Sequence, residues 1–202
     1  MKKIAVVGYK GKMGWPIFLA LEKKYDVFGV GRENSLEDLP KLDLVIDFAS
    51  RESSVKSAEF CLKNNIPLVI GSTGQTDVEN NRLDDISKCI PVIRKANFSQ
   101  GIETSKRLID DILKLKPIGV KISEKHHIHK KDKPSGTAID LKNYIEKKFG
   151  CFVEIQSIRE GEEMGEHKIK FCFEDEELVV QHNVLSRNAF VKGVVREVEK
   201  LI

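Results

Sequence analysis

The densest group of residues able to do chemistry lies between residues 123 and 138. Three of the chain's five histidines fall there, at His126, His127 and His129, and Lys130 follows them. A histidine titrates near neutral pH, so it can donate or accept a proton during a reaction. Lysine adds a positive charge that attracts an anion. The segment therefore predicts a site that binds a small anionic substrate and moves a proton.

A helix start follows the histidines directly. Ser135 is the expected N-cap of a helical pattern that runs on to Gly150, the expected stop. The first N–H groups of a helix have no partner inside the helix, and the helix dipole makes that end positive. Gly136 and Thr137 should therefore form a site for a carboxylate.

Two other interpretations of this segment stay open. Side chains alternate along an extended chain, which would put four residues on one face: Glu124, His126, Ile128 and Lys130. His127 and His129 would share the other face and could ligate a metal, but no cysteine or further carboxylate has a recognisable ligand spacing. A solvated basic loop is the second alternative, and it gives no reason for a helix to begin beside the histidines.

A glycine-rich loop follows the first apolar run of the chain. Glycine recurs at every third position, in Gly8, Gly11 and Gly14, at the start of a helical pattern. Glycines in this context allow a tight turn and let backbone N–H groups approach a pyrophosphate. The spacing is G-x-x-G-x-x-G rather than the common G-x-G-x-x-G. Nucleotide binding is favoured over a plain strand-to-helix turn.

The choice between NADH and NADPH depends on the end of the second expected strand, residues 26–30. NAD-binding domains place an acidic residue there, where it binds the ribose hydroxyls. Here Gly31 and Arg32 occupy the tip, and a cation favours the 2'-phosphate of NADPH. Lys12 could add a second positive charge, whereas Glu33 could still contact the ribose. NADPH is favoured, and NADH stays open.

Short apolar runs alternate with helical patterns over the first half of the chain. The runs are almost continuous in Val, Ile and Leu, as in strands buried on both faces, so we expect a doubly wound, Rossmann-like α/β domain. From Gly101 onward, successive strands predict an α+β domain with an antiparallel sheet and helices on one face. The expected domains are residues 1–97 with 184–202, which would bind the dinucleotide, and residues 98–183, which would bind substrate. The active site would lie between them.

The charge pattern argues against nucleic-acid and membrane partners. The 34 basic and 31 acidic residues are dispersed, with a net charge of +3 and no run of like charges. Glycine interrupts the first apolar run too early for a secretory signal, and no stretch is long enough to cross a bilayer. The scattered cysteines indicate a reducing compartment. We expect a cytoplasmic protein whose partner is a small molecule or another protein.

The motifs of the chain resemble those of the dihydrodipicolinate reductases, also called 4-hydroxy-tetrahydrodipicolinate reductases. The most specific motif is E-x-H-H-x-x-K-x-D-x-P-S-G-T-A, which matches Glu124 through Ala138. The G-x-x-G-x-M-G loop and Ala96 to Gly101 also match, and other segments resemble family motifs in order: Asp47-Phe48-Ala49, Gly71-Ser72-Thr73-Gly74, Arg159 to Gly161, Gly165 to His167, and His182 to Gly193. The resemblance covers nearly the whole chain.

The resemblance implies roles for individual residues. His126 would be the catalytic acid/base, Lys130 would assist proton donation and hold a substrate carboxylate, and His127 would bind substrate. The other carboxylate would lie at the helix start, against Ser135, Gly136 and Thr137. The cofactor contacts would be Gly8, Tyr9, Lys10, Gly11, Lys12, Met13, Arg32, Gly71, Ser72, Thr73, Ala96, Asn97 and Phe98. The resemblance implies no metal.

The implied activity is the NADPH- or NADH-dependent reduction of a cyclic dicarboxylate to tetrahydrodipicolinate, with loss of water, in diaminopimelate and lysine biosynthesis. Either His126 or Lys130 could protonate the product. Family members are usually homotetramers whose contacts lie on the sheet of the second domain. The chain departs from the family pattern at Gly31, Ala49, Ser72 and Lys133, and it stops at Ile202, where the family usually adds a further segment.

Two rival functions compete with the reductase. A non-catalytic nucleotide-binding sensor of the same fold would be expected to lose His126, His127 and Lys130, and all three are present. A dehydrogenase acting on an amino acid would share the glycine loop but not the His-His-x-x-Lys and Pro-Ser-Gly-Thr motifs. The reductase is therefore the favoured function.

Overall fold

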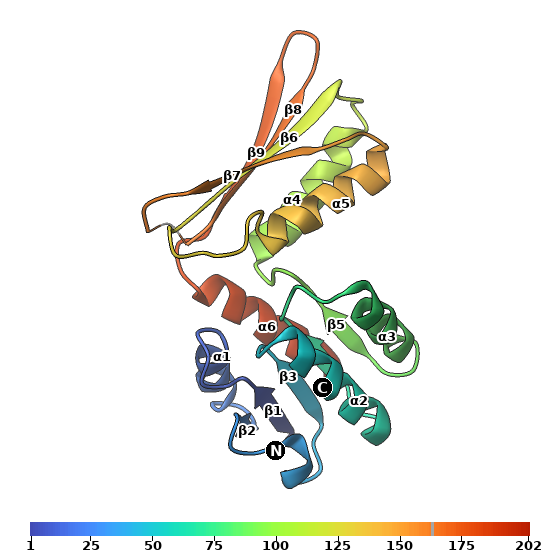
Figure 1. Ribbon diagram of the computed structural model, residues 1–202, viewed down its shortest axis with the longest axis vertical. Helices are drawn as coiled ribbons and strands as arrows, with labels where there is room; N and C mark the ends of the chain where they lie inside the picture. The colour runs from blue at the N-terminus through green and yellow to red at the C-terminus, as the bar shows by residue number, and fades with distance from the viewer. Residues whose placement is uncertain (163) are drawn as a thin grey trace. The chain divides into compact units, whose positions relative to one another are not determined.

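The computed structural model describes residues 1–162 and 164–202, and the chain divides into two compact units (Figure 1). Unit 1 comprises Met1–Phe98 and Phe190–Ile202, and unit 2 comprises Ser99–Ala189. Phe98 joins unit 1 because its side chain packs in that unit's core. The backbone N–H of Val184 donates to the carbonyl oxygen of Gly165, which ties the segment after the last strand to unit 2. That unit 1 binds the dinucleotide and unit 2 binds the substrate stays a prediction.

Unit 1 is a five-stranded parallel sheet in the order β2-β1-β3-β4-β5. Its strands are β1 (Lys3–Val7), β2 (Asp26–Val30), β3 (Leu44–Asp47), β4 (Leu68–Ile70) and β5 (Val92–Arg94). Its helices are α1 (Gly14–Leu21), α2 (Arg51–Asn64), α3 (Asp77–Ser87) and α6 (Asn188–Leu201), with the short 3-10 helix η1 (Leu36–Asp38). The doubly wound α/β prediction is confirmed.

Two apolar cores lie on opposite faces of this sheet. Residues of α2 and α3 pack against one face, with Ala58, Leu83 and Ile86 buried there. Residues of α1 and α6 pack against the other, including Ile17 and Val194. The central strand β3 has no exposed residue, because both of its faces are covered.

Helix α6 packs so closely on the segment that follows β5 that residue 193 has no room for a side chain. A Cβ added at Gly193 would overlap the carbonyl oxygen of Phe98, which is backbone and cannot move aside. We predict that Gly193→Ala lowers the free energy of unfolding by about 2 kcal/mol, since overpacking of about 3 kcal/mol outweighs about 1 kcal/mol of gained helix propensity. Urea unfolding of the variant and of wild type measures this change in the free energy of unfolding. Gly119→Ala is the control, because a Cβ there meets nothing within 4 Å, and equal stability losses would contradict the packing argument.

Unit 2 is a four-stranded sheet in the order β7-β6-β8-β9, with two helices on one face (Figure 1). Its elements are α4 (Gln100–Leu113), β6 (Gly119–His126), α5 (Gly136–Phe149), β7 (Glu154–Arg159), β8 (Glu166–Cys172) and β9 (Glu177–Asn183). The buried side chains of β6 alternate along the strand and face the helices: Val120, Ile122, Glu124 and His126. The apolar face of β6 thus ends in two polar residues.

The prediction of an antiparallel sheet in unit 2 is wrong for one strand pair. β8 runs antiparallel to β6 and β9, but β7 runs parallel to β6. Helix α5 connects β6 to β7, and such a crossover returns the chain in the same direction. Because parallel strands end at the same edge of a sheet, Arg159 lies beside His126 in the strand register.

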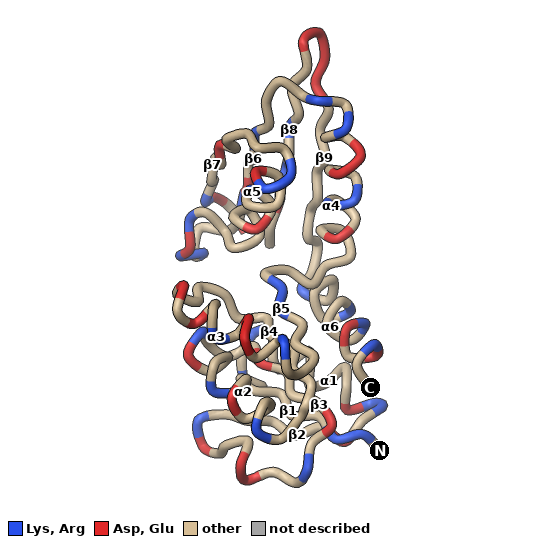
Figure 2. Tube along the Cα trace, turned by 90° about the vertical axis from the view of Figure 1, so that its right-hand side faces the viewer, with Lys and Arg blue, Asp and Glu red and all other residues tan. Residues whose placement is uncertain are grey.

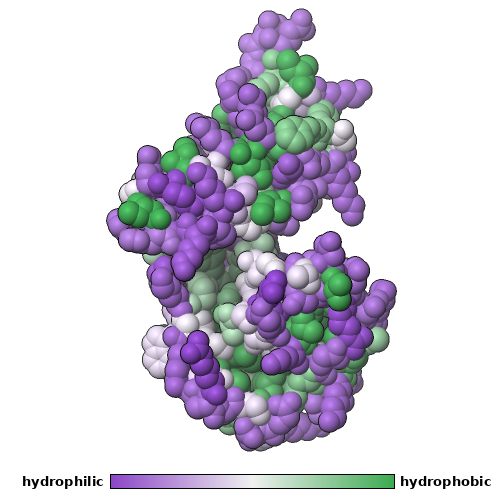
Figure 3. Space-filling model, in the orientation of Figure 1, coloured by the Kyte–Doolittle hydropathy of each residue, from purple (hydrophilic) through white to green (hydrophobic). Residues whose placement is uncertain are grey.

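The surfaces of both units are mixed in charge, with basic and acidic residues interspersed along the chain (Figure 2). Hydrophilic residues cover most of the face in Figure 3, and apolar residues occur between them in small areas. No helix among residues 1–162 and 164–202 is long and apolar enough to span a membrane.

Candidate active site

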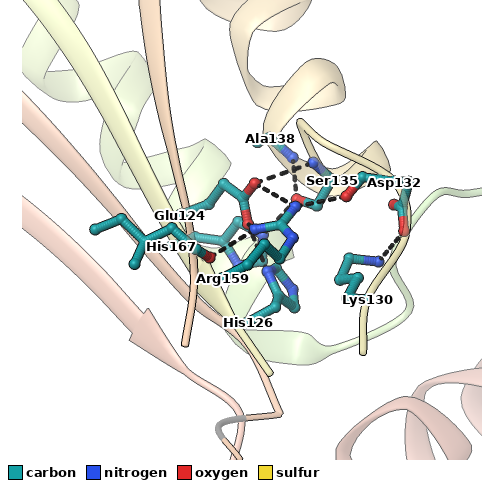
Figure 4. A network of polar contacts seen from close by, with 9 residues as sticks. Glu124, His126, Lys130, Asp132, Ser135, Ala138, Arg159 and His167 are labelled. Carbon is teal, nitrogen blue, oxygen red and sulfur yellow. Dashed lines mark hydrogen bonds and ion pairs between the residues drawn. The ribbon is translucent and has the colours of Figure 1, made fainter. Parts of the chain in front are cut away.

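A buried polar cluster occupies the sheet edge of unit 2 where β6 and β7 end (Figure 4). β6 supplies Glu124 and His126, and the last residue of β7 is Arg159. His167 on β8 pairs with Glu124 in the antiparallel register. Three neighbouring strands of the sheet therefore bring these four side chains together.

The Glu124 carboxylate is the centre of this cluster. It accepts two hydrogen bonds from the Arg159 guanidinium, Nη2 to Oε1 at 2.7 Å and Nη1 to Oε2 at 2.9 Å. His126 Nδ1 lies 2.5 Å from Oε2, and the backbone N–H of Ser135 donates to Oε1 at 3.3 Å. A buried carboxylate is costly unless it is paired and hydrogen-bonded, and here both oxygens are.

The electrostatics of the cluster follow from burial and these pairings. Burial alone would raise the pKa of the Glu124 carboxyl, but the polar contacts with Arg159, Ser157 and His126 together outweigh burial and hold the pKa at about 2. Burial lowers the pKa of His126, and the contact with Glu124 offsets part of that shift. Burial also lowers the pKa of His167, to about 3. At neutral pH Glu124 is therefore ionised and His167 is neutral.

The segment after His126 leaves the sheet. The strand ends at His126, and the backbone N–H of Lys130 donates to the carbonyl oxygen of His127 at 3.1 Å, which closes a turn. The expectation that Ile128 and Lys130 continue one strand face with Glu124 and His126 is therefore wrong. Side chains alternate between the two faces of the sheet only as far as the strand continues, so Glu124 and His126 share a face and the residues of the turn do not follow the alternation.

The turn carries a second charged pair. Lys130 Nζ lies 2.7 Å from Asp132 Oδ1, and Arg159 Nη2 donates to the Asp132 carbonyl oxygen at 2.5 Å. Burial alone would raise the pKa of Asp132, but the hydrogen bond and charge of Lys130, a backbone hydrogen bond and the charge of Arg159 together outweigh burial and lower the pKa. The rings of His127 and His129 lie 6.2 Å apart in the same turn. No set of three metal-ligating side chains occurs in the described part of the chain.

Helix α5 begins beside the cluster, as the sequence predicts. Ser135 Oγ accepts a hydrogen bond from the N–H of Ala138 at 3.2 Å, and the helix ends at Gly150 with φ 71°. Ser135 Oγ also lies 3.2 Å from His167 Nε2, which fixes the cap from the side of the sheet. The N-cap and stop predictions are confirmed. The first-turn N–H groups of Gly136 and Thr137 therefore begin four residues after Asp132 in the sequence.

Gly165 lies directly against the His126 ring. A Cβ added at Gly165 would lie 2.8 Å from His126 Nε2, closer than nonbonded atoms approach. Any side chain at residue 165 would therefore press on the ring nitrogen that faces away from Glu124. Together the cluster offers a proton-active histidine, cationic groups and a helix N-terminus, which suits binding and protonating a small anion.

Unit 1 holds a separate cavity of about 750 Å³ at the glycine loop. Its lining includes four of the predicted cofactor residues, Gly8, Lys10, Gly11 and Arg32. Gly8 has φ 78°, and a Cβ there would lie 2.8 Å from the Cα of Ala49, so the loop backbone is bare at this point. A cavity floored by bare loop backbone and flanked by two cations fits the pyrophosphate of a dinucleotide.

The other predicted cofactor residues do not line this cavity, although two of them pack against Phe48, which does. Gly71 packs against the ring of Phe48, which lines the cavity, so a side chain there would collide with it. Phe98 is 3% exposed and packs against Phe48 with ring centroids 5.5 Å apart. The remaining predicted contacts are absent from the lining residues: Tyr9, Lys12, Met13, Ser72, Thr73, Ala96 and Asn97.

The tip of β2 is organised by a carboxylate. Glu33 Oε1 lies 2.5 Å from Lys10 Nζ, and Tyr9 Oη donates to it at 3.3 Å. A Cβ added at Gly31 would lie 2.5 Å from Glu33 Oε2, so the Glu33 carboxylate covers Gly31. An acidic group therefore occupies the strand tip although residue 31 is glycine, beside the cation of Arg32.

Comparison with known proteins decides the family. Residues 20–98 match the family "Dihydrodipicolinate reductase, N-terminus", and residues 101–202 match "Dihydrodipicolinate reductase, C-terminus". The chain belongs to the dihydrodipicolinate reductase family. A 4-hydroxy-tetrahydrodipicolinate reductase from Thermosipho africanus (strain TCF52B) is 35% identical, with 96% of this chain and 88% of that protein aligned. One from Chlamydia trachomatis serovar A is 36% identical, over 100% of this chain and 87% of that protein.

The fold is shared with a solved dihydrodipicolinate reductase. The dipicolinate-bound protein from Paenisporosarcina sp. TG-14 has a TM-score of 0.79 at 22% identity, covering 100% of this chain and 94% of its own. The sequence analysis predicted His126 and the start of α5 as parts of this site. It assigned no role to Glu124, Arg159, His167 or Gly165, which the structure places in the cluster or against it. Their positions in the Glu-x-His-His, Arg-x-Gly and Gly-x-His motifs were the available signal.

Proposed function

We propose that this chain is a 4-hydroxy-tetrahydrodipicolinate reductase of diaminopimelate and lysine biosynthesis, acting in the cytoplasm. The observation that supports it is the buried Glu124 and His126 pair beside Lys130 and the α5 N-terminus, in a member of this family. In the overall reaction the cyclic dicarboxylate gains one hydride and one proton and loses one water. The solved relative from Paenisporosarcina is bound to dipicolinate, a small dicarboxylate of the kind such a site would accept.

Substrate binding would use the cations of the cluster. Lys130 and His127 would hold one carboxylate, and the α5 start would hold the other through Ser135, Gly136 and Thr137. This arrangement fixes a ring by both of its acidic substituents, so the reacting carbon is held in one orientation. His126 would then deliver the proton through Nε2, the ring nitrogen that faces Gly165. Lys130 would stabilise the negative charge that develops on the conjugated substrate.

The cofactor would be held by unit 1. Gly8, Lys10 and Gly11 would bind its pyrophosphate, and residues at the tip of β2 would bind the adenosine ribose. When bound, a reduced nicotinamide cofactor supplies the hydride. The assembly we propose is a homotetramer, which light scattering in line with size exclusion measures. We expect the mass of four chains, and the mass of one chain would contradict this assembly.

The test of the function is a coupled assay. Dihydrodipicolinate synthase would generate the substrate in situ from pyruvate and aspartate semialdehyde, and oxidation of NADPH or NADH would be followed by absorbance. We expect oxidation that depends on the synthase. Cofactor binding without synthase-dependent oxidation would instead support the non-catalytic sensor.

Arg32 should select between the two cofactors. It lines the cavity at the tip of β2, where a guanidinium would pair with the 2'-phosphate of NADPH. Arg32→Asp should weaken NADPH by roughly 10- to 100-fold in Kd, because a charge-assisted pair of about 1.5–3 kcal/mol is lost. The Kd for NADH should change by less than about threefold, because NADH has no 2'-phosphate. Titration by fluorescence measures both constants, with Lys23→Asp, an exposed change of equal charge, as control. Equal weakening of both cofactors would show that Arg32 does not read the phosphate.

A further inference from the structure

Glu124 makes a contact with His126 that determines which ring nitrogen is available. An ionised carboxylate can only accept hydrogen bonds, and the Arg159 guanidinium keeps Glu124 ionised. The proton in the 2.5 Å contact must therefore reside on His126 Nδ1. In the neutral ring this leaves Nε2 without a proton, and in the charged ring it makes Nε2 the nitrogen that can release one.

The free nitrogen lies against Gly165. A Cβ added at residue 165 would be 2.8 Å from His126 Nε2, so only glycine leaves this ring nitrogen without a side chain pressed on it. Charged or titratable groups surround the ring from each neighbouring element. Glu124 lies on β6, Arg159 on β7, His167 on β8 with its ring 5.3 Å from that of His126, and Lys130 in the turn.

Arg159 also ties the loop to the sheet. It binds both oxygens of Glu124 and the carbonyl oxygen of Asp132, the residue paired with Lys130 (Figure 4). Glu124 in turn accepts from the backbone N–H of Ser135 at the α5 start. One buried ion pair thus connects the histidine, the lysine turn and the helix N-terminus.

We propose that Glu124 and Arg159 are a positioning pair that holds His126 in the tautomer with its proton on Nδ1, so that Nε2 exchanges the proton with substrate. The role of Nε2 rests on the proposed reductase function. The tautomer itself does not, because it is a property of the protein without substrate. Neither Glu124 nor Arg159 needs to touch the substrate for this purpose.

The tautomer is measured directly by ¹⁵N NMR of the imidazole at a pH where the ring is neutral. The wild-type protein should show a protonated Nδ1 and an unprotonated Nε2 for His126, assigned by its loss in His126→Gln. In Glu124→Gln, Arg159 holds the amide oxygen, so the amide N–H₂ faces Nδ1 and should move the ring proton to Nε2. A wild-type ring protonated on Nε2 would overturn the proposal, whether or not the protein turns over.

Kinetics separate positioning from a purely structural role. Glu124→Gln should lower kcat on the order of 100-fold with KM changed less than about threefold, and should shift the pH profile of kcat/KM. In a His126→Gln background the same change should cost less than about threefold, because its effect passes through His126. A full loss in both backgrounds would overturn the proposal.

Glu160→Gln is the matched control. Glu160 directly follows β7 and pairs with Lys125 of β6 at 2.8 Å, and its side chain is mostly exposed. Its backbone N–H donates to the carbonyl oxygen of His126, a bond that the substitution leaves in place. The kcat of this variant should equal that of wild type. A loss of kcat matching that of Glu124→Gln would attribute the effect to the β6 and β7 pairing in general, which would overturn the proposal. Wild type that shows the predicted tautomer but no turnover would reject the reductase function and leave the pair in place.

Discussion

His126→Gln is expected to lower kcat by roughly 10²- to 10⁴-fold while raising KM by less than about threefold. Glutamine keeps a polar side chain near Glu124 but cannot titrate, so proton delivery is lost and substrate binding is largely kept. The loss should be seen with both NADPH and NADH, because the proton does not depend on the cofactor. Steady-state rates from the coupled assay measure it.

The control for this prediction is His129→Gln. His129 is exposed in the turn and lies outside the cluster, so the same substitution there should leave kcat within about twofold of wild type. An unchanged kcat in His126→Gln would remove His126 from the mechanism. Lys130 would then be the remaining candidate for the proton donor.

Stability should fall as the pH is lowered from 7 to 5, and His167 should account for much of the loss. Burial lowers the pKa of His167 to about 3, whereas an unfolded histidine titrates near about 6.5. Below the unfolded pKa the unfolded chain binds a proton that the folded chain does not, so stability is complete above that pH and is lost as the pH falls toward the folded pKa. By pH ~5 the loss is about 2 kcal/mol.

His167→Gln should remove this share of the pH dependence. Urea unfolding followed by amide exchange in β6 and β8 reports on unit 2, where His167 lies. Between the two pH values, the variant should lose about 2 kcal/mol less than wild type. His129→Gln should keep the wild-type dependence. Equal pH dependence in His167→Gln and wild type would show that His167 is not buried neutral.

Features set by neighbouring residues were predictable from the sequence. Ser135 and Gly150 mark the ends of α5 because capping and left-handed stops depend on a few adjacent residues. The α/β alternation of unit 1 was predictable because strands covered on both faces are apolar throughout, as β3 is. The pairing of Glu124 with His126 follows from alternation along one strand.

Features that depend on strand pairing were not predictable. Arg159 reaches Glu124 because β7 pairs with β6 in a register that puts Arg159 beside His126. The helix between the two strands implies their parallel direction, but nothing near Arg159 in the sequence specifies which strand β7 pairs with or in which register. Alternation failed after His126 because a backbone hydrogen bond closes a turn there. Glu33 covers Gly31 by folding back from the strand tip, so reading residue 31 alone missed the carboxylate.

The most direct test of the reductase assignment follows the hydride itself. NADPH carrying deuterium at the transferable position of the nicotinamide would be supplied in ordinary water with synthase-generated substrate, and the product would be analysed by mass spectrometry. The account predicts tetrahydrodipicolinate that carries one deuterium per molecule formed. A reduced product without deuterium, or cofactor oxidation without that product, would contradict the assignment.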